Sequence, residues 1–216
     1  MQIKTIYNNP LEVKTYILYD DTNEAVIIDP GVGTLMERDR LRQFVADKGL
    51  TVKYVIGTHP HIDHVVGFGY CKETFGAPLL MNADGMKVYD HSVAYGVAFG
   101  MDCDKKDFPQ PDQFIKEGDR ICFGHEVLEV IETPGHCAGS VCLYHRASGS
   151  LFVGDLVFRN SVGRSDLPTG NTQALIDSIR YKILPLPEST TLYVGHGDNT
   201  TIEHEKRFNS FFQIES

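Results

Sequence analysis

The sequence has no tryptophan, no Cys-x-x-Cys pair, and no apolar run that approaches the ~20 residues of a membrane-spanning helix. Its five cysteines are an odd number, which favours reduced thiols over a disulfide framework. The opening residues, MQIKTIYNNP, contain no apolar segment of the kind that signal peptides carry. We therefore expect a cytoplasmic protein that does not associate with a membrane.

Basic residues are also scarce. The chain has 20 Lys and Arg against 29 Asp and Glu, which gives a formal net charge of −9. No cluster of Lys and Arg interrupts this acidic composition, so we expect no binding to nucleic acid. A bound metal ion can nevertheless make a single pocket of an acidic protein positive.

The composition is otherwise that of a globular protein. Hydrophobic residues make up 42% of the 216 residues and charged residues 23%. A chain of this length can bury a full core without disulfides or structural metals. We expect one domain over residues 1–216.

Short apolar runs and helical patterns alternate along the chain. This predicts an α/β or α+β fold with two sheets and outer helices. The expected strands are 14–19, 25–28, 52–56, 77–81, 113–115, 120–123, 127–132, 141–145, 151–153 and 191–194, and the expected helices are 36–48, 65–75, 85–91, 172–183 and 200–212. Residues 82–111 are too long for a plain connection, and we interpret them as a cover over an active site.

Aromatic side chains occur throughout that cover. Tyr95, Phe99 and Phe108 either line a pocket or pack the loop, and packing is the favoured interpretation.

The segment from His59 to His64 contains four potential metal ligands. It reads His-Pro-His-Ile-Asp-His and follows an apolar run directly. In an extended segment, residues two apart point the same way, so His59 and His61 can bind one ion. Asp63 and His64 lie where a helix begins and can project toward a second ion. Imidazole and carboxylate ligands suit Zn²⁺, and also Fe or Mn.

Three later residues extend this set of ligands. His136, Asp155 and His196 each follow a strand-like run, where a side chain is held firmly and still reaches a cleft. A single histidine in such a place is usually structural. Four clusters of ligand-type residues at strand ends in one chain indicate a metal centre.

These motifs together resemble the metallo-β-lactamase superfamily and, within it, the short bacterial hydrolases that are similar to glyoxalase II. The resemblance runs from the Asp29-Pro30-Gly31 strand end to the terminal helix. It implies a four-layer αβ/βα sandwich of two mixed β-sheets flanked by helices. It also implies two divalent metal ions, with zinc as the first choice. The implied ligands are His59, His61 and His136 for the first ion and Asp63, His64 and His196 for the second, with Asp155 bridging both.

Differences from some branches of the superfamily indicate which branch this sequence resembles most. Dizinc β-lactamases usually carry Cys at the position of Asp155, and many carry Arg or Cys at that of His64. The segment from Gly163 to Gly170, Gly-Arg-Ser-Asp-Leu-Pro-x-Gly, resembles the short hydrolases, which lack the separate C-terminal helical domain that binds glutathione.

The resemblance implies hydrolysis of a thioester such as S-lactoylglutathione. By this resemblance, two ions ~3.5 Å apart would hold a bridging hydroxide that attacks the carbonyl. Asp63 and Asp155 would be ligands that also orient this hydroxide. A thiolate leaves with little protonation because its conjugate acid has a pKa near ~8.5. Arg164 is the candidate for binding a substrate carboxylate, with an ion pair to Asp166 as the equally weighted alternative.

Other functions stay open at this stage. A mononuclear Fe(II) persulfide dioxygenase would use His59, His136 and Asp155, all of which are present. A lactone or phosphodiester hydrolase is a further alternative. A non-catalytic metal-binding protein is disfavoured because all seven ligands are retained. The oligomeric state is open between monomer and homodimer, with the Phe-rich end of the closing helix as one dimer surface.

The remaining histidines and cysteines fit ordinary roles. We expect His91, His125, His145 and His204 to be structural or on the surface. Cys71, Cys122 and Cys142 lie in apolar runs and are expected in the core, and Cys137 is expected to be a small buried residue near the metals.

Overall fold

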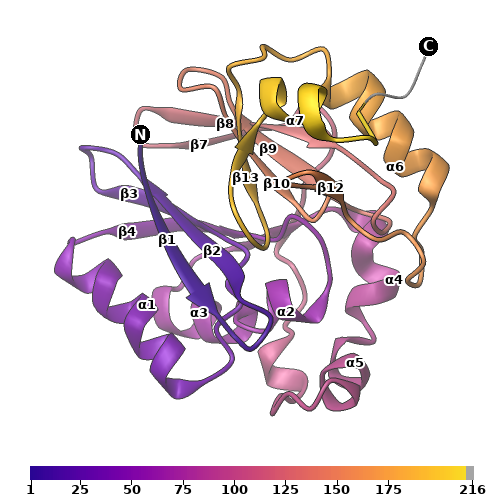
Figure 1. The fold of residues 1–216 in the computed structure, drawn as a ribbon. Coiled ribbons are helices and arrows are strands. Elements are labelled where there is room, and N and C mark those ends of the chain that lie inside the picture. The colour runs from indigo at the N-terminus through magenta and orange to yellow at the C-terminus, as the bar shows by residue number, and fades with distance from the viewer. Residues whose placement is uncertain (213–216) are drawn as a thin grey trace.

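The computed structural model describes residues 1–212, and its first half is built on a six-stranded sheet (Figure 1). The strands lie in chain order, from β1 to β6. The first three pair antiparallel and the last four pair parallel. Their bounds are β1 Gln2–Asn8, β2 Val13–Tyr19, β3 Glu24–Ile28, β4 Thr51–Ile56, β5 Leu79–Met81 and β6 Gln113–Phe114.

The second half contributes another six-stranded mixed sheet, in the order β14-β13-β10-β9-β8-β7. Only its β10–β13 pair is parallel among the described strands. Its strands are β7 Arg120–Phe123, β8 Glu126–Glu132, β9 Val141–His145, β10 Ser150–Gly154, β13 Thr191–Val194 and β14 Thr200–Thr201, and a small separate hairpin joins β11 Val157–Phe158 to β12 Ser161–Val162.

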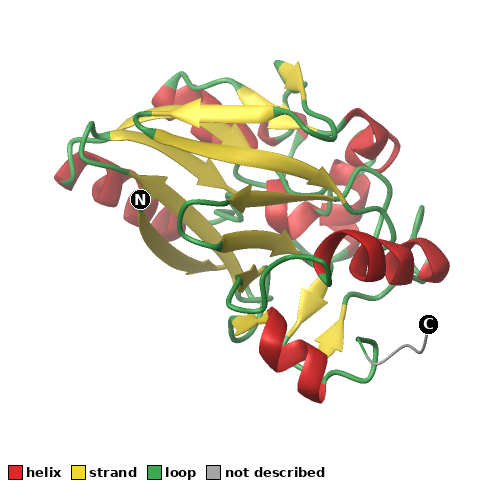
Figure 2. Ribbon diagram, turned by 90° about the horizontal axis from the view of Figure 1, so that it is seen from above, coloured by secondary structure: helices red, strands yellow, loops and turns green. Residues whose placement is uncertain are grey.

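Helices cover the outer faces of both sheets, as Figures 1 and 2 show. The first sheet is covered by α1 and α3, and the second by α6 and α7 on the opposite side of the molecule. The α-helices are α1 Leu35–Asp47, α2 Ile62–Val65, α3 Phe68–Phe75, α4 Met86–Tyr89, α5 Ser92–Ala98, α6 Thr172–Ser178 and α7 Ile202–Phe208. Shorter helical turns are Ala83–Gly85, Lys105–Asp107 and a π-helical extension of α6 at Ile179–Ile183.

Side-chain alternation in the strands produces these layers. In β2, Tyr16 and Leu18 face the second sheet, whereas Ile17 and Tyr19 face the helices α1 and α3. Every residue of β2 is therefore buried, as expected for a strand covered on both faces. The predicted four-layer sandwich of two mixed sheets is confirmed.

Several predicted boundaries are wrong. The helix expected at 65–75 begins only at Phe68, as α3, and Val65 ends the separate helix α2. The helix is interrupted because the Gly67 N–H donates to the Pro30 carbonyl, at 2.8 Å, and not to a carbonyl of α2. The helix expected at 200–212 begins with a short strand and ends at Phe208. The first strand, β1, was not predicted, because most of its residues are polar, namely Gln2, Lys4, Thr5 and Asn8.

One predicted core residue is also wrong. Cys122 is exposed, although Cys71 and Cys142 are buried as expected. The reason is that β7 is an edge strand with one solvated face, so its residues alternate between exposed and buried.

The two sheets meet at the edge where the polar strand ends gather. The backbone N–H of Lys14 on β2 donates to the Gly195 carbonyl after β13, at 2.8 Å. The N–H of Val141 on β9 donates to the Thr58 carbonyl after β4, also at 2.8 Å. The Tyr16 hydroxyl donates to the Val194 carbonyl at 2.7 Å. These bonds hold the loops of both sheets against each other.

Candidate metal centre

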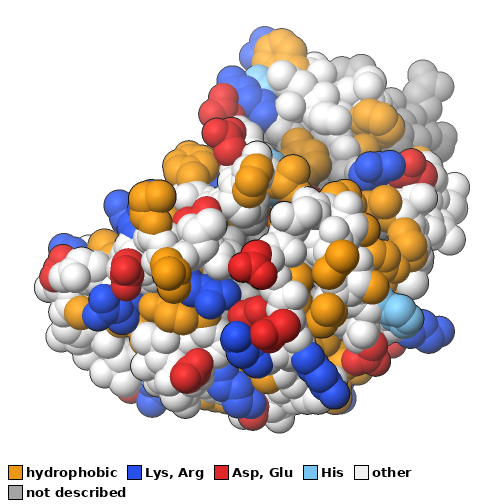
Figure 3. All heavy atoms as spheres, turned by 90° about the horizontal axis from the view of Figure 1, so that it is seen from below, with side chains coloured by type: hydrophobic (Ala, Val, Ile, Leu, Met, Phe, Trp, Pro, Cys, Tyr) orange, Lys and Arg blue, Asp and Glu red, His pale blue; other side chains and the backbone are white. Residues whose placement is uncertain are grey.

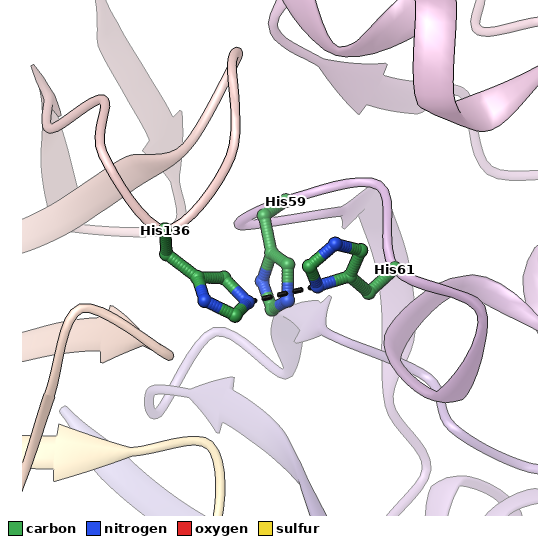
Figure 4. A group of neighbouring side chains, drawn as sticks. All are labelled: His59, His61 and His136. Carbon is green, nitrogen blue, oxygen red and sulfur yellow. Dashed lines mark hydrogen bonds between the residues drawn. The ribbon is translucent and has the colours of Figure 1, made fainter. Parts of the chain in front are cut away.

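Three histidines from two loops form the first part of the centre. His59 and His61 lie in the loop that follows β4, and His136 lies in the loop that follows β8. Figure 4 shows the three rings pointing toward one another from these two loops. The facing nitrogens of His61 (Nδ1) and His136 (Nε2) are 2.8 Å apart. This is a cluster of imidazole nitrogens around one point, as a metal ion requires.

The second part combines two histidines with a carboxylate. His64 and Asp63 come from α2, and His196 follows β13. The Nε2 atoms of His64 and His196 are 3.2 Å apart, and Nε2 of His196 is 3.2 Å from Oδ2 of Asp63. These three side chains form a second group of ligand atoms within 4.8 Å of one another.

Asp155 lies between the two groups. It follows β10, and its Oδ1 is 3.3 Å from Nε2 of His64. Its Oδ2 is 3.6 Å from Nε2 of His196 and 3.9 Å from Nε2 of His136. One carboxylate therefore contacts histidines of both groups. All seven residues singled out in the sequence come together, and their role as metal ligands stays a prediction.

The pattern of unpaired polar atoms fits a metal site. Nε2 of His59 and Oδ1 of Asp155 are buried and have no hydrogen-bond partner. Buried polar atoms are normally paired, so two unpaired ligand atoms in one cluster are informative. Gly195 leaves further room, because a Cβ there would lie 2.1 Å from Oδ1 of Asp155 and 2.8 Å from Cε1 of His64. The donor set of imidazoles and carboxylates suits divalent transition metals.

Asp29 is a buried residue that the sequence analysis treated only as a strand end. Its Oδ1 accepts the Thr58 N–H at 2.7 Å, and its Oδ2 accepts the Thr58 hydroxyl at 2.7 Å and Nδ1–H of His64 at 3.0 Å. The Thr58 oxygen lies 3.0 Å from Nδ1 of His59. Asp29 thus sets the ring orientation of His64 directly and that of His59 through Thr58. Its signal in the sequence was a ligand-type residue at a strand end, like the others.

Backbone carbonyls orient two more histidines. Nδ1 of His136 lies 2.7 Å from the Arg164 carbonyl, and Nδ1 of His196 lies 2.8 Å from the Leu11 carbonyl. Each contact leaves Nε2 facing the centre. Sequence reasoning missed Leu11 entirely, because any residue type supplies a carbonyl.

The two groups differ in their electrostatics. Burial, followed by neighbouring histidines, lowers the pKa of His59 well below its usual value and that of His61 to about 4. Burial also disfavours charge on His64, but Asp155, Asp63 and Asp29 outweigh it and raise the pKa of His64. His59 and His61 are thus held as neutral imidazoles, whereas carboxylates around His64 favour positive charge there.

A cleft of about 570 Å³ opens over the centre. Arg164 lines it, but its guanidinium binds Asp166 through two hydrogen bonds of 2.7 and 2.8 Å. The alternative ion pair is therefore present, and a role for Arg164 in binding substrate stays a prediction. Tyr95 and Phe99 also line the cleft, whereas Phe108 is buried against Tyr89. Packing is confirmed for Phe108 and in part for Tyr95, which lines the cleft and also packs against the core of the first half.

The other histidines and Cys137 lie where ordinary roles place them. His91 and His125 are exposed, His204 lies at the surface beside Asn160, and the buried His145 pairs with Glu126 at 2.7 Å. Cys137 is buried beside Ser140, and burial raises the pKa of its thiol to about 12. A thiol in that state is not a nucleophile at neutral pH.

A profile of the metallo-beta-lactamase superfamily matches residues 9–196. The chain belongs to this superfamily. It is 32% identical to the hydroxyacylglutathione hydrolase GloC of Haemophilus influenzae, over 100% of both chains.

Two solved structures of superfamily members are also similar to this chain. The BLEG-1 B3 metallo-beta-lactamase is 32% identical, with a TM-score of 0.88 over 98% of this chain and 99% of that one. TTHA1623 in a di-iron-bound form is 32% identical, with a TM-score of 0.85 over 98% of this chain and 100% of that one. Membership in this superfamily implies divalent metal ions at the clustered histidines and aspartates. No helix within residues 1–212 combines the length and hydropathy that crossing a bilayer requires.

Proposed function

We propose that the protein is a metal-dependent thioester hydrolase of the glyoxalase II type, with S-lactoylglutathione as the first substrate to test. The observation that carries the proposal is Asp155, whose carboxylate contacts histidines of both ligand groups. The full-length similarity to GloC supports the choice of a thioester. The expected partner is this small-molecule substrate, in a protein that we place in the cytoplasm.

The residues have separable tasks in this proposal. His59, His61 and His136 would hold one ion and Asp63, His64 and His196 the other, with Asp155 shared. Bound divalent ions would supply an activated water and polarise the scissile carbonyl. The carboxylates of Asp63 and Asp155 orient the attacking water. The thiolate departs without a general acid, since its conjugate acid has a pKa near ~8.5.

The test begins with metal-stripped protein that is reloaded separately with Zn²⁺, Mn²⁺ or Fe²⁺. We expect thiol release from S-lactoylglutathione with at least one metal, and loss of that release on chelation. Asp155→Ala should lose more activity than the ~10–100-fold that removal of an outer-shell partner costs. Normal turnover by metal-stripped Asp155→Ala would refute the proposal.

A second candidate rests on the trio His59, His136 and Asp155. Two histidines and one carboxylate can also hold a single Fe(II) with open positions for oxygen and a persulfide. Nε2 of His136 and Oδ2 of Asp155 are 3.9 Å apart, and His59 adjoins the His136 ring. Oxygen uptake with glutathione persulfide by the Fe²⁺ form, without thioester hydrolysis, would favour this activity. A β-lactam should be included as a third substrate, given the similarity to BLEG-1.

A further inference from the structure

The walls of the cleft above the candidate ligands are apolar. Val88, Tyr95 and Phe99 from α4, α5 and the residue after α5 form one wall. Phe158, Leu167 and Pro168 line the cleft as well. The Phe158 ring lies 6.1 Å from that of His196, so the apolar surface begins directly beside the centre. A substrate that reaches the centre must lie against these side chains.

Close backbone packing positions the wall formed by α4 and α5. A Cβ at Gly96 would lie 2.2 Å from Sγ of Cys103 and 3.4 Å from Ile62, the residue before Asp63. A Cβ at Gly139 would lie 2.2 Å from the backbone nitrogen of Gly85. Larger residues would separate these segments. The wall is therefore seated directly on the two loops that carry His61 and His136.

The mouth of the cleft leaves large apolar side chains in solvent. Phe99 is 67% exposed and Leu11 is 51% exposed. Both also line an adjoining cavity of about 630 Å³, so apolar surface continues beyond the cleft. Figure 3, seen from the side on which α5 lies in Figure 1, shows hydrophobic side chains at the surface among charged ones. An apolar ligand group at the mouth would remove this surface from water.

The charge of the cleft does not favour an ionic ligand group away from the centre. Apart from the candidate ligands, Arg164 is the charged residue of the cleft lining among the described residues. Asp166 accepts hydrogen bonds from Nε and Nη2 of Arg164 and offsets its positive charge. A substrate carboxylate at Arg164 would therefore also face the negative charge of Asp166, whereas an uncharged apolar group would not.

We propose that this cleft selects thioesters by an apolar acyl group larger than lactoyl, which packs against Val88, Tyr95 and Phe99. The inference rests on the proposed thioester hydrolysis and concerns its acyl substrate. Each added methylene group that leaves water for this wall is worth about a fourfold change in kcat/KM. The acyl group, and not the thiol, determines which thioesters are hydrolysed fastest.

The test compares acetyl, butyryl and hexanoyl thioesters of two thiols, glutathione and the small thiol N-acetylcysteamine, with the metal-loaded protein. We expect kcat/KM to rise about two- to fourfold per methylene for both thiols. A flat or falling series with continued thiol release would overturn the inference and leave the proposed function standing. If kcat/KM depends on the identity of the thiol and not on the length of the acyl group, the inference is also overturned. No release from any of these thioesters or from S-lactoylglutathione would overturn the proposed function itself.

Two variants test whether the dependence of kcat/KM on acyl length comes from contact with this wall or from the hydrophobicity of the substrate alone. Phe99→Ser removes a cleft-lining ring, and we expect it to reduce the gain per methylene. Val97→Ser is the matched control, because Val97 is 66% exposed, lies two residues away and does not line the cleft. It should keep the wild-type dependence on acyl length. Equal dependence in all three proteins would contradict the role of this wall.

Discussion

Asp29→Asn is the most informative single substitution for the metal centre. The wild-type carboxylate accepts three hydrogen bonds, two from Thr58 and one from Nδ1–H of His64. An amide offers one oxygen and one NH₂ group in the same volume. The backbone of Asp29 has φ of +50°, which asparagine tolerates well, so the substitution leaves the local fold intact.

The single amide oxygen can accept a hydrogen bond either from the Thr58 N–H or from Nδ1–H of His64, but not from both. If its oxygen accepts the Thr58 N–H, its NH₂ group faces Nδ1 of His64, which then has to give up its proton. The proton moves to Nε2 of His64, the nitrogen that faces His196. A protonated nitrogen cannot bind a metal. The opposite orientation leaves the buried Thr58 N–H unpaired at a cost of ~1–3 kcal/mol, so it is disfavoured.

The effect should fall mainly on one ion. We expect Asp29→Asn to weaken binding by the Asp63–His64–His196 group ~10–100-fold, or ~1.4–2.8 kcal/mol. The trio of His59, His61 and His136 should be affected less, because the Thr58 oxygen can accept from the amide and from Nδ1–H of His59 together. Titration of metal-stripped protein with Zn²⁺ against a chromogenic chelator measures both affinities.

Asp107→Asn is the matched control. Asp107 is likewise buried in the first half of the chain, and it accepts hydrogen bonds from Arg38 and from the Asp104 N–H, both at 3.0 Å, and belongs to neither group of candidate ligands. It should bind two equivalents as the wild type does. If Asp29→Asn folds and binds two equivalents with wild-type affinity, the assignment of Asp29 as a positioning residue is wrong.

Three further predictions concern other parts of the molecule. Gly195→Ala should reduce metal content and hardly change the melting temperature of the metal-free protein, because the new Cβ displaces Asp155; Gly33→Ala, with no atom closer than 3.9 Å, should match the wild type. Glu37→Gln should lower the free energy of unfolding by ~1 kcal/mol at pH 7. Burial raises the pKa of Glu37, but N–H groups of Thr34, Asn9 and Gly33 outweigh it and lower that pKa. The stabilisation by the Glu37 carboxylate is present above the unfolded pKa of ~4.3 and is lost as pH falls through the lower folded pKa. In urea unfolding at low pH, the wild type and Glu37→Gln should therefore have the same free energy of unfolding. Iodoacetamide should label exposed Cys122 readily, whereas Cys71, Cys137 and Cys142, whose pKa values burial raises, should react only on unfolding, as peptide mass spectrometry would show.

The sequence by itself predicted which residues come together in the candidate metal centre. His59, His61, Asp63 and His64 lie within six residues, and the other three candidate ligands follow apolar strands. Both features are local, since metal preference depends on residue type and strand patterns depend on alternation over a few residues. Most strands were predictable for the same reason, whereas the four-layer architecture was predicted from the resemblance to the superfamily.

Only the tertiary structure decided how these residues are arranged. Asp155 lies between the two groups because β10 of one sheet ends opposite α2 of the other half, a contact across about ninety residues that no local pattern encodes. The positioning role of Asp29, the carbonyl of Leu11 and the apolar walls of the cleft likewise join distant segments. Packing of the two sheets determines such contacts, because backbone carbonyls and shared apolar surfaces do not depend on a recognisable residue pattern.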